Sequence, residues 1–256
     1  MLEKQTHRAL DRSVDATEIA KFAAMAEEWW DPDGKFRPLH RFNPIRIEFI
    51  RDRVAAHFGK DVRSGRPLAG LKILDVGCGG GLLCEPMARL GADVTGIDAT
   101  ERNVEIAKSH AATMELDIDY RFCTASDLAV DGAVYDVVLN MEVIEHVADP
   151  AAFVEDCSRL VRPGGMMILA TLNRTAKSYL LAIVGAEYVL RWLPRGTHDW
   201  RRFVRPSELA AWIRAGGLTV SEMTGVSFNP LKDAWRLAPR DLDVNYMIVA
   251  DRPGND

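Results

Sequence analysis

The feature that most constrains the fold is a glycine-rich loop that follows a short apolar segment. Lys72-Ile-Leu-Asp-Val76 predicts a buried strand, followed by the loop Gly77-Cys-Gly-Gly-Gly81 and a predicted helix over 82–90. Glycines allow a tight turn and let a ligand approach the backbone. The start of the helix adds free N–H groups and the positive end of its dipole. The loop therefore predicts a ligand site at the carboxyl end of a strand.

Strand and helix patterns alternate along most of the remaining chain. Further strands are predicted over 94–97, 120–123, 135–139, 166–170, 218–223 and 244–249. Further helices are predicted over 101–113, 150–161 and 206–215. This alternation builds βαβ units, in which helices cover both faces of a parallel sheet. We therefore expect an α/β fold with a doubly wound, mostly parallel, seven-stranded sheet.

Two helices are predicted ahead of the sheet, as an N-terminal helical extension. Asp15, with Glu18 three residues later, is typical of a capping box that opens the first helix. Asn43 and Pro44 are typical of the N-cap and first residue of the second helix, which Gly59 would end.

Charge and composition exclude several classes of protein. The formal net charge of −5 argues against a chain that wraps nucleic acid. The four cysteines lack the paired spacing of a zinc site, and a reduced, cytoplasmic setting is the simplest expectation. No apolar run reaches the ~20 residues that span a bilayer, and the first residues lack the apolar core of a secretory signal.

The spacing of the loop glycines separates two classes of ligand. A dinucleotide site would need a third glycine where this chain has Leu82. The pattern present is Asp-x-Gly-x-Gly-x-Gly, from Asp75 to Gly81, and it resembles the S-adenosylmethionine (SAM) loop of class I methyltransferases. Asp98 ends the next strand, where a carboxylate can accept both ribose hydroxyls. The resemblance to this superfamily implies that Asp127 lies near the adenine amino group.

An acidic segment follows the strand predicted over 135–139. If it makes a helical turn, Glu142, Glu145 and His146 share one face at positions i, i+3 and i+4. Two carboxylates and an imidazole suit a divalent cation such as Mg²⁺, Mn²⁺ or Zn²⁺. The alternative is a solvated acidic face, with His146 as a general base or a packed residue. Metal binding and general-base catalysis both make this segment the catalytic candidate.

Further motifs are spread over nearly the whole chain. They are Lys21-Phe22, Trp29-Trp30-Asp31, Pro38-Leu39-His40-Arg41, Asn43-Pro44, Arg46, Thr171-Leu-Asn-Arg174, Val184-Gly-Ala-Glu-Tyr188, Gly196-Thr-His-Asp199 and Asp243-Val-Asn-Tyr-Met247. Together with the loop from Leu74 to Gly81, they resemble the motifs of the ubiquinone biosynthesis O-methyltransferases.

This resemblance implies a SAM-dependent enzyme with a Rossmann-like fold that methylates a polyprenylated catechol or demethylubiquinol, in both O-methylation steps. The residues implied to bind SAM are Arg46, Gly77, Gly79, Asp98, Asp127 and Met141. Arg46 would hold the methionine carboxylate, and Met141 would lie against the adenosine. Glu142, Glu145 and His146 match the E-x-x-E-H segment read as a metal site in relatives. A ubiquinone-biosynthesis complex is an implied partner.

An apolar insert follows the strand predicted over 166–170. Residues 178–193 are mostly apolar, and Arg174, Lys177 and Arg195 flank them. The segment is too short and too interrupted to cross a membrane. It suits a lid over the active site, a helix lying in a membrane interface, or both. The second option predicts contact with anionic lipid through 174–195, at the inner face of the membrane.

We expect one domain over 1–256 with four parts. They are an N-terminal helical cap (1–60), a SAM-binding core (71–171), the apolar insert (174–200) and a C-terminal helix with strands (206–250). The main alternative is a class I methyltransferase for another small acceptor. A SAM-binding module without chemistry is disfavoured by the acidic segment, and an NAD dehydrogenase is disfavoured by Leu82.

Overall fold

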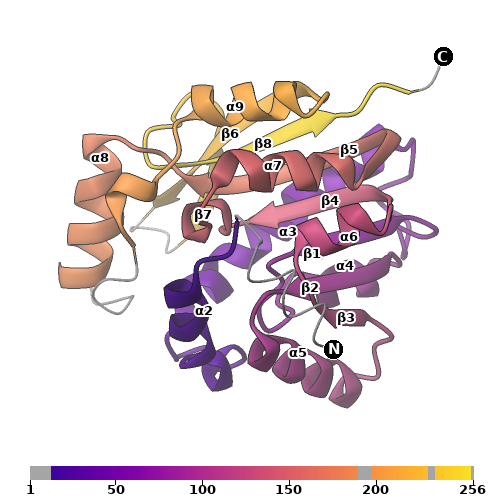
Figure 1. The fold of residues 1–256 in the computed structure, drawn as a ribbon, viewed down its shortest axis with the longest axis horizontal. Helices are drawn as coiled ribbons and strands as arrows, with labels where there is room; N and C mark the ends of the chain where they lie inside the picture. The colour runs from indigo at the N-terminus through magenta and orange to yellow at the C-terminus, as the bar shows by residue number, and fades with distance from the viewer. Residues whose placement is uncertain (1–12, 190–197, 230–233, 255–256) are drawn as a thin grey trace.

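The computed structural model describes residues 13–189, 198–229 and 234–254. An eight-stranded sheet runs through the middle of the molecule (Figure 1). The strands are β1 (Lys72–Val76), β2 (Asp93–Asp98), β3 (Asp119–Phe122), β4 (Tyr135–Met141), β5 (Val161–Leu172), β6 (Thr219–Asn229), β7 (Ala234–Ala238) and β8 (Asn245–Asp251). Their order is β3-β2-β1-β4-β5-β8-β6-β7. The strands from β3 to β5 in this order pair in parallel, whereas β8, β6 and β7 add antiparallel.

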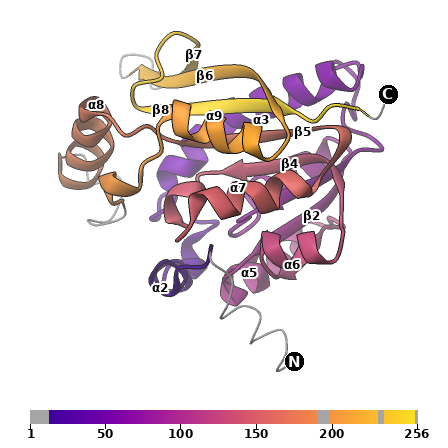
Figure 2. The same ribbon diagram turned by 45° about the horizontal axis from the view of Figure 1, so that its top comes forward.

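Helices cover both faces of the sheet, which confirms the doubly wound α/β class. One face packs against α3 (Arg37–His57), α4 (Cys84–Arg89) and α5 (Glu101–Thr113). The other packs against α6 (Ala125–Val130), α7 (Pro150–Arg159) and α9 (Pro206–Ala215), as Figure 2 shows. Ile73 and Leu74 of β1 point into opposite cores, as the alternation of side chains along a strand requires.

The sheet has one strand more than the predicted seven. The extra strand is β7, a short edge strand that pairs only with β6 in the part of the chain described. Its five residues are all exposed or half-buried, without the buried apolar run that marks the central strands. Pairing with β6 therefore defines β7 more than its own sequence does.

The N-terminal extension comprises α2 (Ala16–Ala23), the 3₁₀ helix η1 (Ala26–Glu28) and α3. Asp15 caps α2 as predicted, since its carboxylate accepts hydrogen bonds from Thr17 N and Glu18 N. The predicted start of the second helix at Asn43 is wrong. Helix α3 begins at Arg37 and continues through Pro44.

Tertiary contacts explain why Asn43 does not cap a helix. Its Nδ2 donates to Leu82 O at 2.7 Å, and its Oδ1 accepts from Arg46 Nη2 at 2.9 Å. The side chain is thus used to join α3 to the end of the glycine loop. The pair Asn43-Pro44 is a cap signal only when the asparagine is free to bond its own backbone.

Short helices follow β4 and β5. The 3₁₀ helix η2 (Ile144–His146) follows β4, and the insert after β5 consists of α8 (Ala176–Ser178) and the π-helix η3 (Tyr179–Val189). A further 3₁₀ helix, η4 (Trp200–Arg202), precedes α9. Residues 190–197 of the predicted insert lie outside the described ranges. Within those ranges, no helix combines the length and apolarity needed to cross a membrane.

Candidate active site

A cavity of about 650 Å³ lies at the carboxyl ends of β1, β2 and β4. Its walls come from the glycine loop, α2, α3, the segment around η2, the insert and the hairpin β6–β7. Figure 1 shows α2, α8 and β7 at the end of the sheet toward which the arrow of β4 points. Ligands of open α/β sheets bind at this end of the strands, and a cavity of this size suits a small molecule.

The glycine loop requires glycine at two of the predicted positions. Gly77 has a φ of +71°, and a Cβ there would lie 2.6 Å from Val143 Cγ2. Gly79 has a φ of +54°, and a Cβ there would overlap the indole of Trp29. A side chain would be strained by the backbone at either position. Both glycines line the cavity, as the sequence predicts for a ligand-binding loop.

Asp98, at the end of β2, is held by donors from the loop and from α5. Its Oδ2 accepts from Gly79 N at 2.9 Å, and its Oδ1 accepts from Thr100 N at 2.7 Å and Asn103 Nδ2 at 3.2 Å. Asn103 Oδ1 in turn accepts from Trp29 Nε1 at 2.9 Å. Burial raises the pKa of Asp98, and the donated hydrogen bonds oppose that rise. The carboxyl group is therefore fixed at the cavity wall.

Arg46 brings a buried guanidinium from α3 to the cavity. Its Nη2 donates to Asn43, but its Nε has no hydrogen-bond partner among the described residues. Burial lowers the pKa of Arg46, and the carboxyl groups of Glu142 and Asp75 oppose this effect. A buried donor without an acceptor is unfavourable. The group therefore fits an anionic ligand, such as the carboxylate predicted from the sequence.

Of the two other predicted cofactor residues, Met141 lines the cavity, whereas the carboxylate of Asp127 caps a helix. Met141 is buried at the end of β4 and lines the cavity. Asp127 lies in the first turn of α6, where its Oδ2 accepts from Thr124 N at 2.9 Å and Thr124 Oγ1 at 3.1 Å. Its carboxylate completes a capping box there. The predicted adenine contact of Asp127 stays a prediction, whereas Thr124 and Ala125 line the cavity.

The acidic segment after β4 does not form the helical turn assumed from the sequence. Glu142 has a φ of +61°, and only Ile144–His146 forms a short 3₁₀ helix. Glu142 and Glu145 lie close enough for each carboxyl group to affect the pKa of the other. His146 is directed to α2 instead, where its Nδ1 lies 2.8 Å from Glu18 Oε2. The three predicted residues therefore do not share one face.

Glu142 and Glu145 form a buried carboxyl pair. Burial raises the pKa of Glu145 to about 8, the charge of Glu142 adds to this, and a hydrogen bond from Thr171 Oγ1 at 2.8 Å opposes it. Burial also raises the pKa of Glu142, which the charge of Arg46 opposes. Two adjacent buried carboxyl groups resist double ionisation. The pair therefore holds its last proton more tightly than an exposed carboxyl group does.

The predicted metal set is not assembled in this structure. Across the ranges that the structure describes, no three His, Cys, Asp or Glu side chains gather in a group that could hold a metal ion. Glu142 and Glu145 each have a buried Oε1 that finds no hydrogen-bond partner among the described residues, which suits a cation or a shared proton. His146, the third predicted ligand, is hydrogen-bonded to Glu18 instead. The positive φ at Glu142 and the single turn of η2 explain the difference.

His146 has the surroundings of an oriented neutral imidazole. Phe22 packs edge-on against its ring at 5.0 Å between centroids, and the His198 ring lies 6.1 Å away. Burial lowers the pKa of His146, and the hydrogen bond with Glu18 opposes this effect. Because a carboxylate accepts at Nδ1, the neutral ring carries its proton there and presents Nε2 as an acceptor. Glu18 and His146 both line the cavity.

Sequence reasoning missed the site roles of Glu18, Trp29 and Asn103. Glu18 was predicted as a capping-box residue, yet its carboxylate contacts His146. Trp29 covers the glycine loop and is bonded to Asn103, which also bonds Asp98. The paired tryptophans ahead of the second helix were a signal for Trp29. No local pattern distinguishes Asn103 from other polar residues of a helix.

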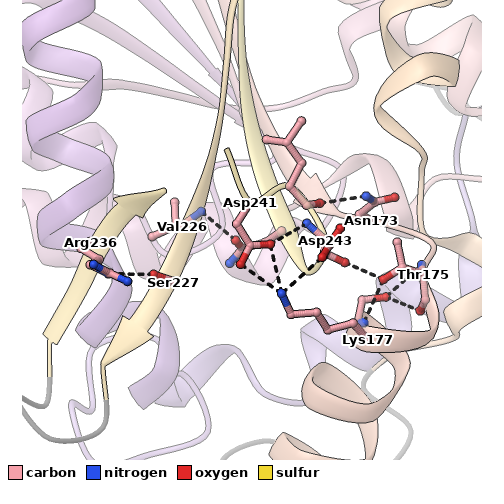
Figure 3. Close-up of polar contacts among 11 residues, drawn as sticks. Asn173, Thr175, Lys177, Val226, Ser227, Arg236, Asp241 and Asp243 are labelled. Atoms are coloured by element: carbon pink, nitrogen blue, oxygen red, sulfur yellow. Dashed lines mark hydrogen bonds and ion pairs between the residues drawn. The ribbon is translucent and has the colours of Figure 1, made fainter. Parts of the chain in front are cut away.

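Lys177 of α8 joins the insert to the loop before β8, as Figure 3 shows. Its Nζ lies 3.1 and 3.0 Å from the two carboxylate oxygens of Asp241 and 3.3 Å from Asp243 Oδ2. Thr175 Oγ1 also donates to Asp243 O at 2.5 Å. Lys177 and Asp241 line the cavity, so these bonds set the position of the insert at its wall.

Comparisons with known proteins agree with this arrangement. A model described as a methyltransferase domain matches residues 74–169. The ubiquinone biosynthesis O-methyltransferase of Parvibaculum lavamentivorans is 60% identical over 245 residues, which cover 96% of each chain. That of Sinorhizobium medicae is 60% identical over 241 residues, 94% of this chain and 97% of the relative. The solved magnesium protoporphyrin IX methyltransferase of Synechocystis with bound SAH is 18% identical, with a TM-score of 0.66 over 96% of this chain and 99% of that one, and shares the fold.

Proposed function

Because the chain belongs to the ubiquinone biosynthesis O-methyltransferase family, we propose that it methylates a phenolic hydroxyl of a polyprenylated catechol or demethylubiquinol, in both O-methylation steps. The protein is a SAM-dependent methyltransferase. The observation that carries the proposal is that one cavity joins the glycine loop and Asp98 to His146. These are the elements that a methyl donor and a phenolic acceptor require side by side.

The donor half of the cavity fits the parts of SAM. The backbone at Gly77 and Gly79 is open to close approach, and Asp98 is the carboxyl group for the ribose hydroxyls. Arg46 pairs with the methionine carboxylate through its buried guanidinium, whose Nε lacks a partner within the described chain. Met141 provides an apolar contact for the adenosine.

When bound, SAM supplies a methyl group that its sulfonium has already activated. The residues of the chain must align the acceptor oxygen with the methyl carbon and the sulfur, which is a positioning task. They must also remove the proton of a phenol, whose pKa is ordinarily ~10. We assign this proton to His146 Nε2, because Glu18 holds Nδ1 and burial keeps the ring neutral. Loss of this proton leaves the phenolic oxygen as the nucleophile for the methyl group that bound SAM would supply.

The carboxyl pair contributes orientation in this scheme. Glu142 lines the cavity near the charge of Arg46, and Glu145 is buried beside it. The Glu142 carboxylate can therefore accept a hydrogen bond from one hydroxyl of a catechol ring, with Glu145 as its support. The described residues do not present a three-ligand metal set, so no step of this scheme passes through a cation.

We also propose that the insert contacts a membrane surface. Tyr179, Leu180 and Leu181 are 46%, 58% and 54% exposed, which is unusual for apolar side chains that lie side by side. The basic flank is partly neutralised, because Arg174 pairs with Glu208 and Lys177 with Asp241. The contact therefore rests on apolar insertion more than on charge. A ubiquinone-biosynthesis complex is a second candidate occupant of this face.

Transfer of radiolabelled methyl from SAM to a catechol tests the proposed function. We expect labelled O-methyl product with the purified protein, and SAM affinity reduced about tenfold or more in Arg46→Lys, which loses the forked donor geometry. Arg51→Lys is the matched control, because Arg51 lies on the same helix in surface ion pairs. Binding of SAM without any product from catechols would contradict the proposed acceptor class. Absence of SAM binding would contradict the donor.

A further inference from the structure

The cavity extends beyond the residues that suit SAM, to the hairpin β6–β7. Phe228 and Trp235 pair across this hairpin, both line the cavity, and their ring centroids lie 5.2 Å apart. Phe42 of α3 lies 4.9 Å from the ring of Trp235, and the guanidinium of Arg46 lies 4.9 Å from the ring of Phe42. A continuous row of aromatic rings thus leads from the donor site to the hairpin.

The polar side chains at this end of the cavity are bonded to one another. Lys177 pairs with Asp241, and Arg236 Nε donates to Ser227 Oγ at 3.1 Å (Figure 3). Because these polar groups already have partners, the wall that a ligand would contact at this end of the cavity is mainly apolar. A ligand part that lies here needs no hydrogen-bonding groups of its own.

This part of the cavity reaches the protein surface beside the insert. Leu181 of η3 lines the cavity and is 54% exposed. Its neighbour Ala182 also lines the cavity and packs with the small cluster formed by Leu172, Ile183 and Phe203. A long ligand can therefore begin at the donor site, follow the aromatic row and leave the protein next to the exposed apolar side chains of the insert.

We propose that this groove, bounded by Phe42, Phe228, Trp235 and Leu181, binds the isoprenoid chain of the acceptor and makes Phe228 and Trp235 specificity-determining residues. The inference rests on the proposed function, since it assigns the tail of the same acceptor. An isoprenoid chain is apolar, flexible and longer than its aromatic head, which matches the wall chemistry and the exit. Aromatic side chains provide large apolar contact areas for such a chain.

A chain-length series tests the groove. The probes are catechol and catechols that carry one, two or three isoprene units, assayed below their aggregation limits. In the unaltered protein, we expect kcat/KM to rise about tenfold over the first one or two units, because each adds buried apolar area, and then to level off where the chain leaves the groove. For Trp235→Ala, we expect kcat/KM to fall about tenfold more toward the two-unit probe than toward catechol itself.

A second variant acts in the opposite direction. Phe228→Trp places a larger side chain in the groove, on the face of β6 that meets Trp235, so we expect kcat/KM to stop rising, or to fall, at a shorter chain length than in the unaltered protein. Met114→Ala is the control, because Met114 is an exposed apolar residue at the end of α5, outside the cavity lining, and should leave the series unchanged. Phe228→Trp retains Trp235, so the test survives if Trp235→Ala fails to fold.

The outcomes separate the inference from the proposed function. A flat chain-length series with good turnover of catechol would overturn the groove and leave the proposed function standing. Unaltered chain-length dependence in Trp235→Ala and Phe228→Trp would overturn the assignment to β6–β7. Failure to methylate every probe would contradict the proposed function itself.

Discussion

Glu18 and His146 are separated by 128 positions in the sequence, yet Glu18 Oε2 lies 2.8 Å from His146 Nδ1. Glu18 belongs to the N-terminal helix α2, whereas His146 follows the central strand β4. Arg202 pairs with Asp15 at the start of α2 and lies 3.9 Å from Glu18 Oε1. The N-terminal extension therefore orients a side chain of the catalytic core in addition to covering the cavity.

Loss of the Glu18 charge should slow methyl transfer. In Glu18→Gln we expect kcat to fall about tenfold to a hundredfold, because the imidazolium formed on proton uptake loses its carboxylate partner. SAM affinity, measured by calorimetry, should change little. Glu27→Gln is the control, since Glu27 pairs with Arg102 on the outer side of the same extension. Equal kcat values in the two variants would contradict the orienting role of Glu18.

The pH profile of the same variant should shift in a defined direction. Burial lowers the pKa of His146 from its ordinary value of 6.5, and the hydrogen bond to Glu18 raises it in part. Removing the charge of Glu18 therefore lowers the pKa of His146 further. The acid limb of kcat/KM, measured from pH 5 to 8, should move to lower pH in Glu18→Gln although kcat falls. A shift to higher pH would argue that His146 is not the base.

The carboxyl pair should make stability decrease toward alkaline pH. Burial raises the pKa of Glu145 from its ordinary value of 4.5 to about 8, so the folded state binds the proton more tightly than the unfolded state. The stabilisation from this proton is complete at a pH below the ordinary pKa of 4.5, and it is lost as the pH rises through the raised pKa of the folded state. Between pH 5 and 9 the free energy of unfolding should decrease in the unaltered protein. In Glu145→Gln this decrease should be smaller by about 1 to 3 kcal/mol.

Urea denaturation across this pH range measures the effect. Glu155→Gln is a matched control, because Glu155 is exposed and pairs only with Arg159 among the contacts described for it. Its pH dependence should follow that of the unaltered protein. Identical curves for Glu145→Gln and the unaltered protein would show that Glu145 is ionised in the folded state.

A methyl group at Gly79 should impair both folding and donor binding. In Gly79→Ala the new Cβ overlaps the indole of Trp29 at a φ of +54°, so we expect a loss of about 2 kcal/mol or more in unfolding free energy. SAM affinity should fall at least about tenfold, because the displaced loop also loses its bond to Asp98. Gly65→Ala is the control, since a Cβ there meets no atom within 4 Å. Thermal unfolding and calorimetry measure both quantities.

Membrane contact should depend on the exposed side chains of the insert. We expect binding to vesicles that contain anionic lipid, and its loss in the double variant Leu180→Asp/Leu181→Asp. Because Arg174 and Lys177 are already paired, salt should weaken the binding only in part. Met114→Asp, which changes an exposed apolar residue elsewhere, should bind normally. Absence of flotation with vesicles at low salt would rule out the contact.

Local sequence was sufficient to predict the loop and the strand-end carboxylate that form the proposed donor half of the site. The strand before Gly77, the glycines of the loop and Asp98 at the next strand end lie within a short stretch of chain. Each is tied to a backbone need that only a few residue types meet, such as a positive φ or a carboxylate at a strand terminus. Parallel pairing of β1 and β2 then brings the loop and Asp98 together, and no contact with a distant part of the chain is needed.

Tertiary structure decided the hydrogen-bond partners of residues whose side chains could bond in several ways locally. Asn43 and Glu18 both matched capping patterns, but contacts with Leu82 and His146 hold their side chains elsewhere. The positive φ at Glu142 separated His146 from the two glutamates that share its motif. Polar side chains choose the partner that best offsets their burial, and such partners come from elements far apart in the chain. The sequence therefore determined the loop and the carboxylate proposed to bind the donor, whereas packing determined which other side chains line the cavity.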